Sequence, residues 1–452
     1  MELQHELNRL FGLTAFRDGQ EETIVSLLEG HDTLAQLPTG TGKSLCYQMV
    51  GYLKEGLVVI VSPLISLMED QVSRILHLGE RRVACINSAS LPEERASLLN
   101  HLSELKFLFM SPEMIQNTTI LAHLTRQKIA LFVVDEAHCI SQWGFDFRPE
   151  YRLLGEVKKR LGSPVTLALT ATATEQVRID IKKSLLSGRM SEFVYSVDRP
   201  NIALFVKKSE NKLAELEELL MNIDEPTIIY CATRKKVEEL YGHFCENYSI
   251  GYYHGGLSTG ERSLLQKQFK ENYLQILIAT NAFGMGIDKP DIRYVLHYDL
   301  PDSVENYVQE IGRAGRDGQE SFAMLFYQKG DEQIHYYFQD QARDDWVQKM
   351  AGTMDHATVN ETKHASQKEQ QKMEANQQEK KRKLQQMLGY LAESVCRRKY
   401  LLNYFGEKNS GQANNCCDLH DATLDLKKNS HRKQKTKRQD EWEEILEKIF
   451  KE

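Results

Sequence analysis

The chain has 452 residues, of which 41% are apolar, so we expect about three folded domains with real cores rather than a disordered or fibrous protein. The chain has 57 lysines and arginines and 64 acidic residues, which gives a formal charge of −7. Because the chain as a whole is not basic, any phosphate-binding surface must be a local patch. The eight cysteines lack the regular spacing of a secreted disulfide framework. Because no apolar run reaches transmembrane length, we expect a cytoplasmic protein with no membrane partner.

Short β-branched runs alternate with longer stretches of helical period up to about residue 330, which is the pattern of βαβ units around a parallel sheet. A first series of expected strands comprises residues 33–37, 57–61, 107–110, 131–135 and 165–169. A second series comprises residues 227–231, 250–253, 276–279, 294–297 and 322–326. The pattern predicts an α/β fold of two tandem P-loop-type domains, with a boundary near residues 197–202, where Pro200 interrupts the periodicity.

The composition changes after about residue 335, so a helical third region is expected. Residues 355–386 are rich in Lys, Gln and Glu and read as exposed helices. A basic run follows Cys417, either as a solvated tail or as a phosphate-binding arm. We therefore divide the chain into residues 1–199, 200–335, 336–425 and 426–452.

The run LPTGTGKS, which ends at Ser44, carries a strong chemical signal because it lies between an expected strand and a helical run. Gly40 and Gly42 allow backbone N–H groups to close around phosphate oxygens, Lys43 reaches the β- and γ-phosphates, and Ser44 ligates Mg²⁺. Leu37 replaces the first glycine of the common P-loop pattern. The alternative, an ordinary glycine turn, does not account for the strand-loop-helix context.

The sequence DEAH follows the apolar strand 131–134. A carboxylate at the C-terminal end of a strand lies where an open α/β sheet binds its ligand. Asp135 is therefore expected to hold Mg²⁺ and Glu136 to polarise the attacking water. Together with the P-loop, this motif predicts a site that hydrolyses ATP.

With these motifs the chain resembles a superfamily-two helicase, and more narrowly the RecQ family, over almost all of its first 406 residues. The resemblance rests on long, ordered motifs at residues 16–20, 38–48, 61–71, 135–151, 169–174, 279–290, 309–318 and 396–407. The family implies a 3′-to-5′ DNA helicase with two RecA-like lobes and a zinc-bearing helical module. The family's winged-helix and HRDC domains are not recognisable in the 32 residues after His420.

The resemblance also implies roles at the nucleotide. Gln20 matches the residue that reads adenine, a role suited to an amide that both donates and accepts. Leu13 stands where the family usually has an aromatic ring to stack on the base, so selectivity for ATP is expected to be looser. The implied nucleotide contacts are completed by Arg17, Thr39, Gly40, Thr41, Gly42, Lys43, Ser44 and Asp288.

Two arginines of the GRAGRDG motif, Arg313 and Arg316, resemble those that the second lobe directs at the γ-phosphate. Guanidinium groups spread positive charge over a loose phosphoryl transition state. For Arg313, a contact to DNA phosphate is the alternative.

The loop after DEAH, residues 141–151, combines aromatic side chains with an arginine. Trp143 and Phe147 suit stacking on unpaired bases, and Arg148 suits a phosphate contact. A buried hydrophobic plug is the alternative. Phe145 replaces a histidine that is common in the family. Hydroxyl or amide residues at strand ends are further candidates for DNA contacts without sequence preference, namely Ser62, Ser66, Thr172, Thr233 and Asn281.

The C-terminal module departs from the family pattern. The family has one cysteine before three more in overlapping C-x-x-C steps, whereas this chain has Cys396, Cys416, Cys417 and His420, with Cys416 one residue out of register. Four Zn²⁺ ligands can still be counted. The alternative is a decayed site whose cysteines only pack.

We therefore expect an ATP-dependent DNA helicase that uses ATP, Mg²⁺ and Zn²⁺. Its partners would be single-stranded and forked or tailed DNA, together with DNA-repair proteins, and the chain would act as a monomer, at the nucleoid in a bacterium. An ATP-gated clamp or annealing protein, an RNA motor and a catalytically silent scaffold are the competing hypotheses. The scaffold is disfavoured because Lys43, Ser44, Asp135, Glu136 and Arg316 are all present.

Overall fold

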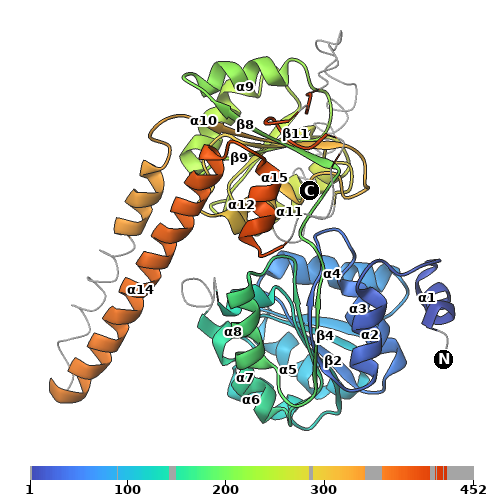
Figure 1. The fold of residues 1–452 in the computed structure, drawn as a ribbon. Coiled ribbons are helices and arrows are strands. Elements are labelled where there is room, and N and C mark those ends of the chain that lie inside the picture. Colours follow the sequence, from blue (N-terminus) through green and yellow to red (C-terminus); the bar gives the residue numbers. More distant parts are fainter. Residues whose placement is uncertain are drawn as a thin grey trace. The chain divides into compact units, whose positions relative to one another are not determined.

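A computed structural model of the chain describes residues 3–88, 90–141, 149–284, 289–341, 359–407, 413, 415–420 and 422–424. They form two compact units (Figure 1), each built on its own sheet. The first unit contains residues 3–198 and 402–407, and the second contains the other described residues. Within the described ranges, no helix is both long and apolar enough to cross a membrane.

The first unit contains a parallel sheet of seven strands among the described residues, in the order β3-β4-β2-β5-β6-β1-β7. Buried runs such as LVVIV and FLFM form its interior strands, because both faces of these strands are covered by helices. The strands are β1 (Asp32–Gln36), β2 (Leu57–Val61), β3 (Val83–Ile86), β4 (Phe107–Met110), β5 (Ile129–Val134), β6 (Thr166–Thr170) and β7 (Met190–Val194).

Two helical layers cover this sheet (Figure 1). One face packs against α1 (Leu3–Phe11), α2 (Gln20–Leu28), α3 (Ser44–Leu53) and α4 (Ile65–His77). The other face packs against α5 (Pro92–Asn100), α6 (Thr118–Leu124), α7 (Leu154–Arg160) and α8 (Glu175–Leu185). Short 3₁₀ turns occur at η1 (Leu102–Glu104), η2 (Ala137–Ile140) and η3 (Pro149–Leu153). Two separate apolar cores result, one on each side of the sheet.

The second unit contains a parallel sheet of six strands in its described part, in the order β10-β11-β9-β12-β13-β8. The strands are β8 (Ile202–Lys208), β9 (Thr227–Tyr230), β10 (Ile250–Tyr253), β11 (Ile276–Ala279), β12 (Tyr294–His297) and β13 (Ser321–Tyr327). Its helices include α9 (Lys212–Leu220), α10 (Arg234–Phe244), α11 (Thr259–Lys270) and α12 (Val304–Ile311).

The helices α14 (Val359–Ala392) and α15 (Arg397–Tyr404) complete the C-terminal region (Figure 1). The last turns of α14 bury apolar side chains, including Leu384 and Met387. Tyr390 of α14 lies against Tyr307 of α12, with their hydroxyl oxygens 3.3 Å apart. This end of the long helix is therefore part of the second unit.

The predicted fold class, two RecA-like parallel-sheet domains followed by a helical module, is confirmed. Every predicted strand exists within a residue or two of its expected bounds. Three strands were not predicted: β3, β7 and β8. The four-part division of the chain stays a prediction.

A buried ion pair lies at the N-terminal end of β1 in the first sheet. The carboxylate of Asp32 in β1 bonds to the ammonium group of Lys158 in α7, and both side chains are at most 7% exposed. The same carboxylate accepts hydrogen bonds from the backbone N–H groups of Thr166 and Ser187, at 2.9 and 2.8 Å. One acidic side chain thus joins β1, β6, α7 and the segment after α8.

Replacement of Lys158 by methionine should destabilise the first unit by about 3–5 kcal/mol, because the carboxylate of Asp32 would stay buried without its cation. Urea unfolding measures the difference. Lys159→Met is the matched control, since Lys159 is exposed and its contact to Glu156 lies at the surface. Equal stability of the two variants would contradict a structural role of the buried pair.

Candidate nucleotide, DNA and zinc sites

The P-loop connects β1 to α3. Gly40 and Gly42 have φ values of 83° and 75°, which glycine adopts readily and other residues rarely do. A Cβ atom on Gly42 would lie 3.2 Å from Nε2 of Gln20. The glycines therefore allow both the left-handed backbone and the close approach of a side chain.

Gln20 and Arg17 hold the P-loop from the side. The Gln20 Nε2 group donates to the carbonyl oxygens of Thr41 and Gly42, at 2.7 and 3.1 Å. The Gln20 Oε1 atom accepts from the backbone N–H of Arg17 at 2.9 Å. Arg17 Nη1 donates to the carbonyl oxygen of Gly40. The two residues therefore hold the backbone of the P-loop, and their binding of nucleotide stays a prediction. Adenine reading by Gln20 stays a prediction.

Asp135 and Glu136 directly follow β5. Glu136 has a φ of 49°, a strained value for a residue with a side chain, and its N–H donates to Asp135 Oδ1 at 3.0 Å. Burial and the neighbouring Glu136 carboxylate raise the pKa of Asp135 to about 7, while the charge of Lys43 acts in the opposite direction. The P-loop lysine and the two DEAH carboxylates therefore form one electrostatic unit.

His138, which the sequence reasoning did not single out, connects this site to the strand β6. Its Nδ1 lies 3.1 Å from Thr170 Oγ1 and 3.3 Å from Glu136 Oε2. The Thr170 hydroxyl in turn donates to the carbonyl oxygen of Thr172 at 3.1 Å. The fourth letter of DEAH and the LTATAT motif are the sequence signals of this contact.

The predicted DNA contacts occupy different environments. Ser62 and Thr172 are 2% and 4% exposed, so their side chains are buried in the first unit. Thr233 accepts a hydrogen bond from the Lys236 N–H and caps α10, whereas Asn281 is exposed after β11. Ser66 lies in α4, and its side chain is outside the described residues, as are Trp143, Phe147, Arg148 and Asp288.

Asn281 lies at an open pocket in the second unit, with a volume of about 120 Å³. The pocket is formed at the C-terminal ends of β9 and β12, where a parallel sheet usually binds ligands. His297 and Glu310 line it and pair through Nε2 and Oε2 at 2.9 Å.

The GRAGRDG segment follows α12 and is held by a residue that the sequence reasoning missed. Arg199 donates to the carbonyl oxygens of Gly312, Ala314 and Gly315 at 2.7–3.0 Å. Arg313 is 4% exposed and donates to the carbonyl oxygen of Gly284. Arg313 thus fixes the backbone after β11 in this arrangement, and its role at the γ-phosphate stays a prediction.

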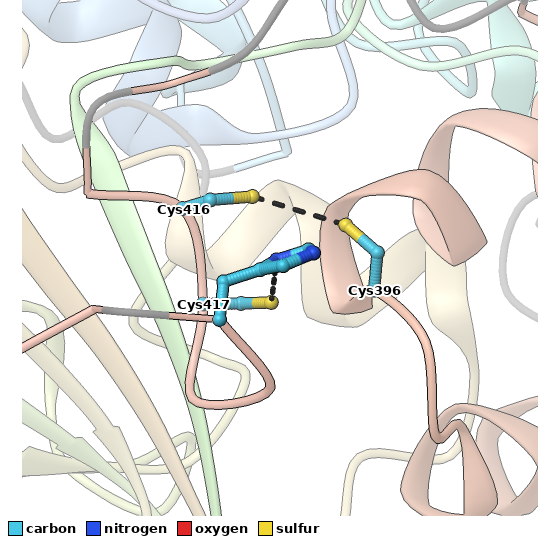
Figure 2. Close-up of side chains that lie close together, drawn as sticks. Cys396, Cys416 and Cys417 are labelled. Atoms are coloured by element: carbon cyan, nitrogen blue, oxygen red, sulfur yellow. Dashed lines mark hydrogen bonds between the residues drawn. The ribbon is translucent and has the colours of Figure 1, made fainter.

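The four side chains that were predicted to bind zinc converge in the C-terminal module. The ligand atoms of Cys396, Cys416, Cys417 and His420 all lie within 4.8 Å of one another. Figure 2 shows the Cys416 and Cys417 thiols directed toward Cys396, which precedes α15. Thiolates on a tetrahedral Zn²⁺ lie roughly 3.8 Å apart for Zn–S bonds of about 2.3 Å. The Cys396 and Cys416 sulfur atoms are 3.8 Å apart, so this donor set fits Zn²⁺.

The zinc-ligand segment is joined to the second sheet. The N–H of Leu204 in β8 donates to the carbonyl oxygen of Cys416 at 3.2 Å, and the Asp418 N–H donates back to the Leu204 carbonyl at 2.9 Å. Asp418 also accepts hydrogen bonds from Arg397 at 3.0 and 3.2 Å. The shift of Cys416 by one residue is compatible with convergence because this short extended segment pairs alongside β8.

Comparisons with known proteins agree with the order of these sites. The DEAD/DEAH box helicase family matches residues 17–179, the helicase conserved C-terminal domain matches residues 211–318, and the RecQ zinc-binding family matches residues 353–421.

Two relatives come from Bacillus subtilis (strain 168). The protein named "Probable ATP-dependent DNA helicase RecS" is 49% identical over 337 residues, which are 74% of this chain and 68% of that protein. ATP-dependent DNA helicase RecQ is 38% identical over 432 residues, which are 93% of this chain and 68% of that protein. The chain spans about two thirds of the length of each relative.

A solved structure of Mss116p, bound to single-stranded RNA and AMP-PNP, superposes with a TM-score of 0.63 and covers 90% of both chains. Its sequence identity is 18%, so this likeness shows the fold alone.

Replacement of Asp135 by asparagine should stabilise the first unit more at alkaline pH than at acidic pH. A carboxyl whose pKa rises from 3.8 to about 7 on folding contributes stability that is complete below 3.8 and is lost as the pH rises through 7. Relative to the wild type, the variant should gain roughly 1–3 kcal/mol between about pH 5 and about pH 8. Urea unfolding without Mg²⁺ or nucleotide measures this gain. Glu93→Gln, at an exposed position, is the control, and a gain independent of pH would contradict the burial of Asp135.

Cys396→Ser should remove zinc and destabilise the C-terminal module, because three ligands hold the ion far less tightly than four and metal binding is coupled to folding. Metal analysis and limited proteolysis measure the two effects. Cys245→Ser, at an exposed cysteine outside the cluster, should keep about one zinc per chain. A folded wild-type protein that contains no zinc would show that the cluster only packs.

Proposed function

This chain belongs to the RecQ family of ATP-dependent DNA helicases, and from that premise we propose that it couples ATP hydrolysis to 3′-to-5′ translocation on single-stranded DNA and to duplex unwinding. The observation that carries the proposal is the joint placement of Lys43, Asp135 and Glu136 at the C-terminal edge of the first sheet. This edge is where such sheets bind nucleotides.

Within that site each residue has a role that follows from its chemistry. Lys43 binds the β- and γ-phosphates, Ser44 and Asp135 hold Mg²⁺, and Glu136 orients the attacking water. The backbone from Thr39 to Gly42 surrounds the phosphates. When bound, Mg²⁺ neutralises charge on the phosphates.

Arg313 and Arg316 are proposed to stabilise charge on the γ-phosphate during hydrolysis. Arg199 supports this proposal because it fixes three carbonyl groups of the loop that carries both arginines. A contact of Arg313 to DNA phosphate remains the alternative.

Single-stranded DNA is proposed to bind through polar groups at strand ends, which contact phosphates without reading sequence. The exposed Asn281 at the open pocket of the second unit favours this role. Thr233 already caps a helix and Ser62 is buried, so their contribution would need a local change. Trp143, Phe147 and Arg148 are proposed to stack on bases and bind phosphate.

The zinc ion is proposed to be structural, because four protein ligands leave no open coordination position. We further propose that the protein acts in DNA repair or recombination as a cytoplasmic, nucleoid-associated monomer on forked or tailed DNA. The membership in a family of DNA helicases supports this setting.

Lys43→Ala should abolish ATP hydrolysis because the phosphates lose their point charge, whereas Glu136→Gln should bind ATP and hydrolyse it at least 100-fold more slowly, about the contribution of a positioned general base. Steady-state ATPase assays and nucleotide-binding titrations measure these effects. The control is Lys54→Ala, since Lys54 lies after α3 and donates to the Leu27 carbonyl. Near-normal turnover by either site variant would refute the assignment.

The function itself is tested with wild-type protein on duplexes that carry a 3′ or a 5′ tail. We expect ATPase stimulation by single-stranded DNA and unwinding of the 3′-tailed duplex only. Stimulation without strand displacement would favour the ATP-gated clamp or annealing protein. Stronger stimulation by RNA than by DNA would favour the RNA motor.

A further inference from the structure

Gln36, the last residue of β1, is buried in an unusual way. Its side chain is 1% exposed, and neither amide atom has a hydrogen-bond partner among the described residues. An unpaired buried polar group destabilises the folded state, so native proteins rarely contain one without a reason. The residue stands directly before the P-loop, at the edge of the nucleotide site.

The strand register places this amide beside Thr170. Gln36 of β1 pairs with Thr170 of β6 in a parallel ladder, so the two side chains point to the same face. Leu34 and Ala168, two residues earlier on each strand, both belong to the core that lies under α5 to α8. Neighbouring strands are about 4.8 Å apart, which brings the Gln36 amide within reach of the Thr170 hydroxyl.

The Thr170 hydroxyl is at present fully used. Its O–H donates to the Thr172 carbonyl at 3.1 Å, while its oxygen accepts from the Thr172 N–H at 3.3 Å and from His138 Nδ1 at 3.1 Å. His138 Nδ1 also lies 3.3 Å from Glu136 Oε2, an oxygen that is buried without a hydrogen bond in the described part of the chain. His138 Nδ1 therefore lies between two acceptors, Thr170 Oγ1 and Glu136 Oε2, and its hydrogen bond is made to Thr170.

We propose that Gln36 is a positioning residue for ATP hydrolysis, acting through an exchange of hydrogen bonds at Thr170. When the His138 N–H turns from Thr170 to Glu136, the Gln36 Nε2 group donates to the lone pair that His138 leaves on Thr170 Oγ1. The exchange leaves Thr170 satisfied, pairs the idle Gln36 donor and orients the Glu136 carboxylate. This inference rests on the proposed ATPase function.

The exchange explains why an unpaired amide is retained. In the present arrangement the cost falls on Gln36 and Glu136, and in the second arrangement both gain a partner. Without Gln36, His138 could reach Glu136 only by leaving an unfilled acceptor on Thr170. The unpaired polar atoms raise the free energy of the present arrangement, and this reduces the free-energy difference between it and the second arrangement.

Gln36→Met keeps the length of the side chain and removes its amide. The variant should lower kcat of ATP hydrolysis about 10-fold, the worth of one hydrogen bond, and leave KM for ATP within about twofold. Its melting temperature should rise by about 2–4 °C because an unpaired polar group has been removed. Lower stability together with normal kcat would overturn the proposal.

Double-mutant cycles test whether Gln36 acts through Thr170. In a Thr170→Val background, Gln36→Met should change kcat less than about twofold, because the shared acceptor is absent. An additional 10-fold loss in that background would overturn the exchange. A cycle with His138→Ala gives the same test by a second variant.

Leu34→Met is the matched control, since Leu34 lies on the same strand and face and its replacement conserves volume. It should leave kcat unchanged, and a loss equal to that of Gln36→Met would assign the effect to packing. Wild-type protein without ATPase activity would refute the proposed function, whereas active wild type with an equally active Gln36→Met variant would refute this inference alone.

Discussion

Two adjacent carboxylates at the end of β5 repel each other, and the nucleotide site is organised around this repulsion. Asp135 and Glu136 lie partly buried, and Lys43 is the P-loop cation that acts on Asp135. Burial and Glu136 still outweigh Lys43, which is why the pKa of Asp135 stays near 7. A divalent cation bound at this position would relieve the repulsion, so the site is built to gain energy from the ion that accompanies ATP.

The strands that sequence alone could predict are those whose apolar runs are buried on both faces, such as β2 and β4. The edge strand β7 alternates exposed and half-buried residues and includes Glu192, so its composition resembles a loop. β8 begins two residues after Pro200. Because the proline was interpreted as a domain boundary, the strand that follows it was not predicted. Edge strands and strands beside proline depend on pairing partners that are far away in the sequence.

The sequence motifs predicted which residues form the candidate site, but they did not predict which groups these residues contact. Gln20 was predicted as a base reader, yet its amide holds the P-loop backbone, and such a contact between a side chain and a backbone carbonyl leaves no pattern in sequence. Arg199 lies far from the GRAGRDG loop that it binds. His138 and Gln36 could be related only through the strand register that places Thr170 between them.

The C-terminal module shows how tertiary pairing can replace an exact spacing. In sequence, Cys416 is one residue away from the position expected for a zinc ligand. In the structure, the segment from Cys416 to Asp418 pairs with Leu204 of β8, and Asp418 is bound by Arg397 at the start of α15. This pairing fixes the ligand segment against Cys396 by hydrogen bonds that do not depend on the metal. The sheet of the second unit therefore shapes the candidate zinc site, and a bound zinc ion would join the helical module to that sheet.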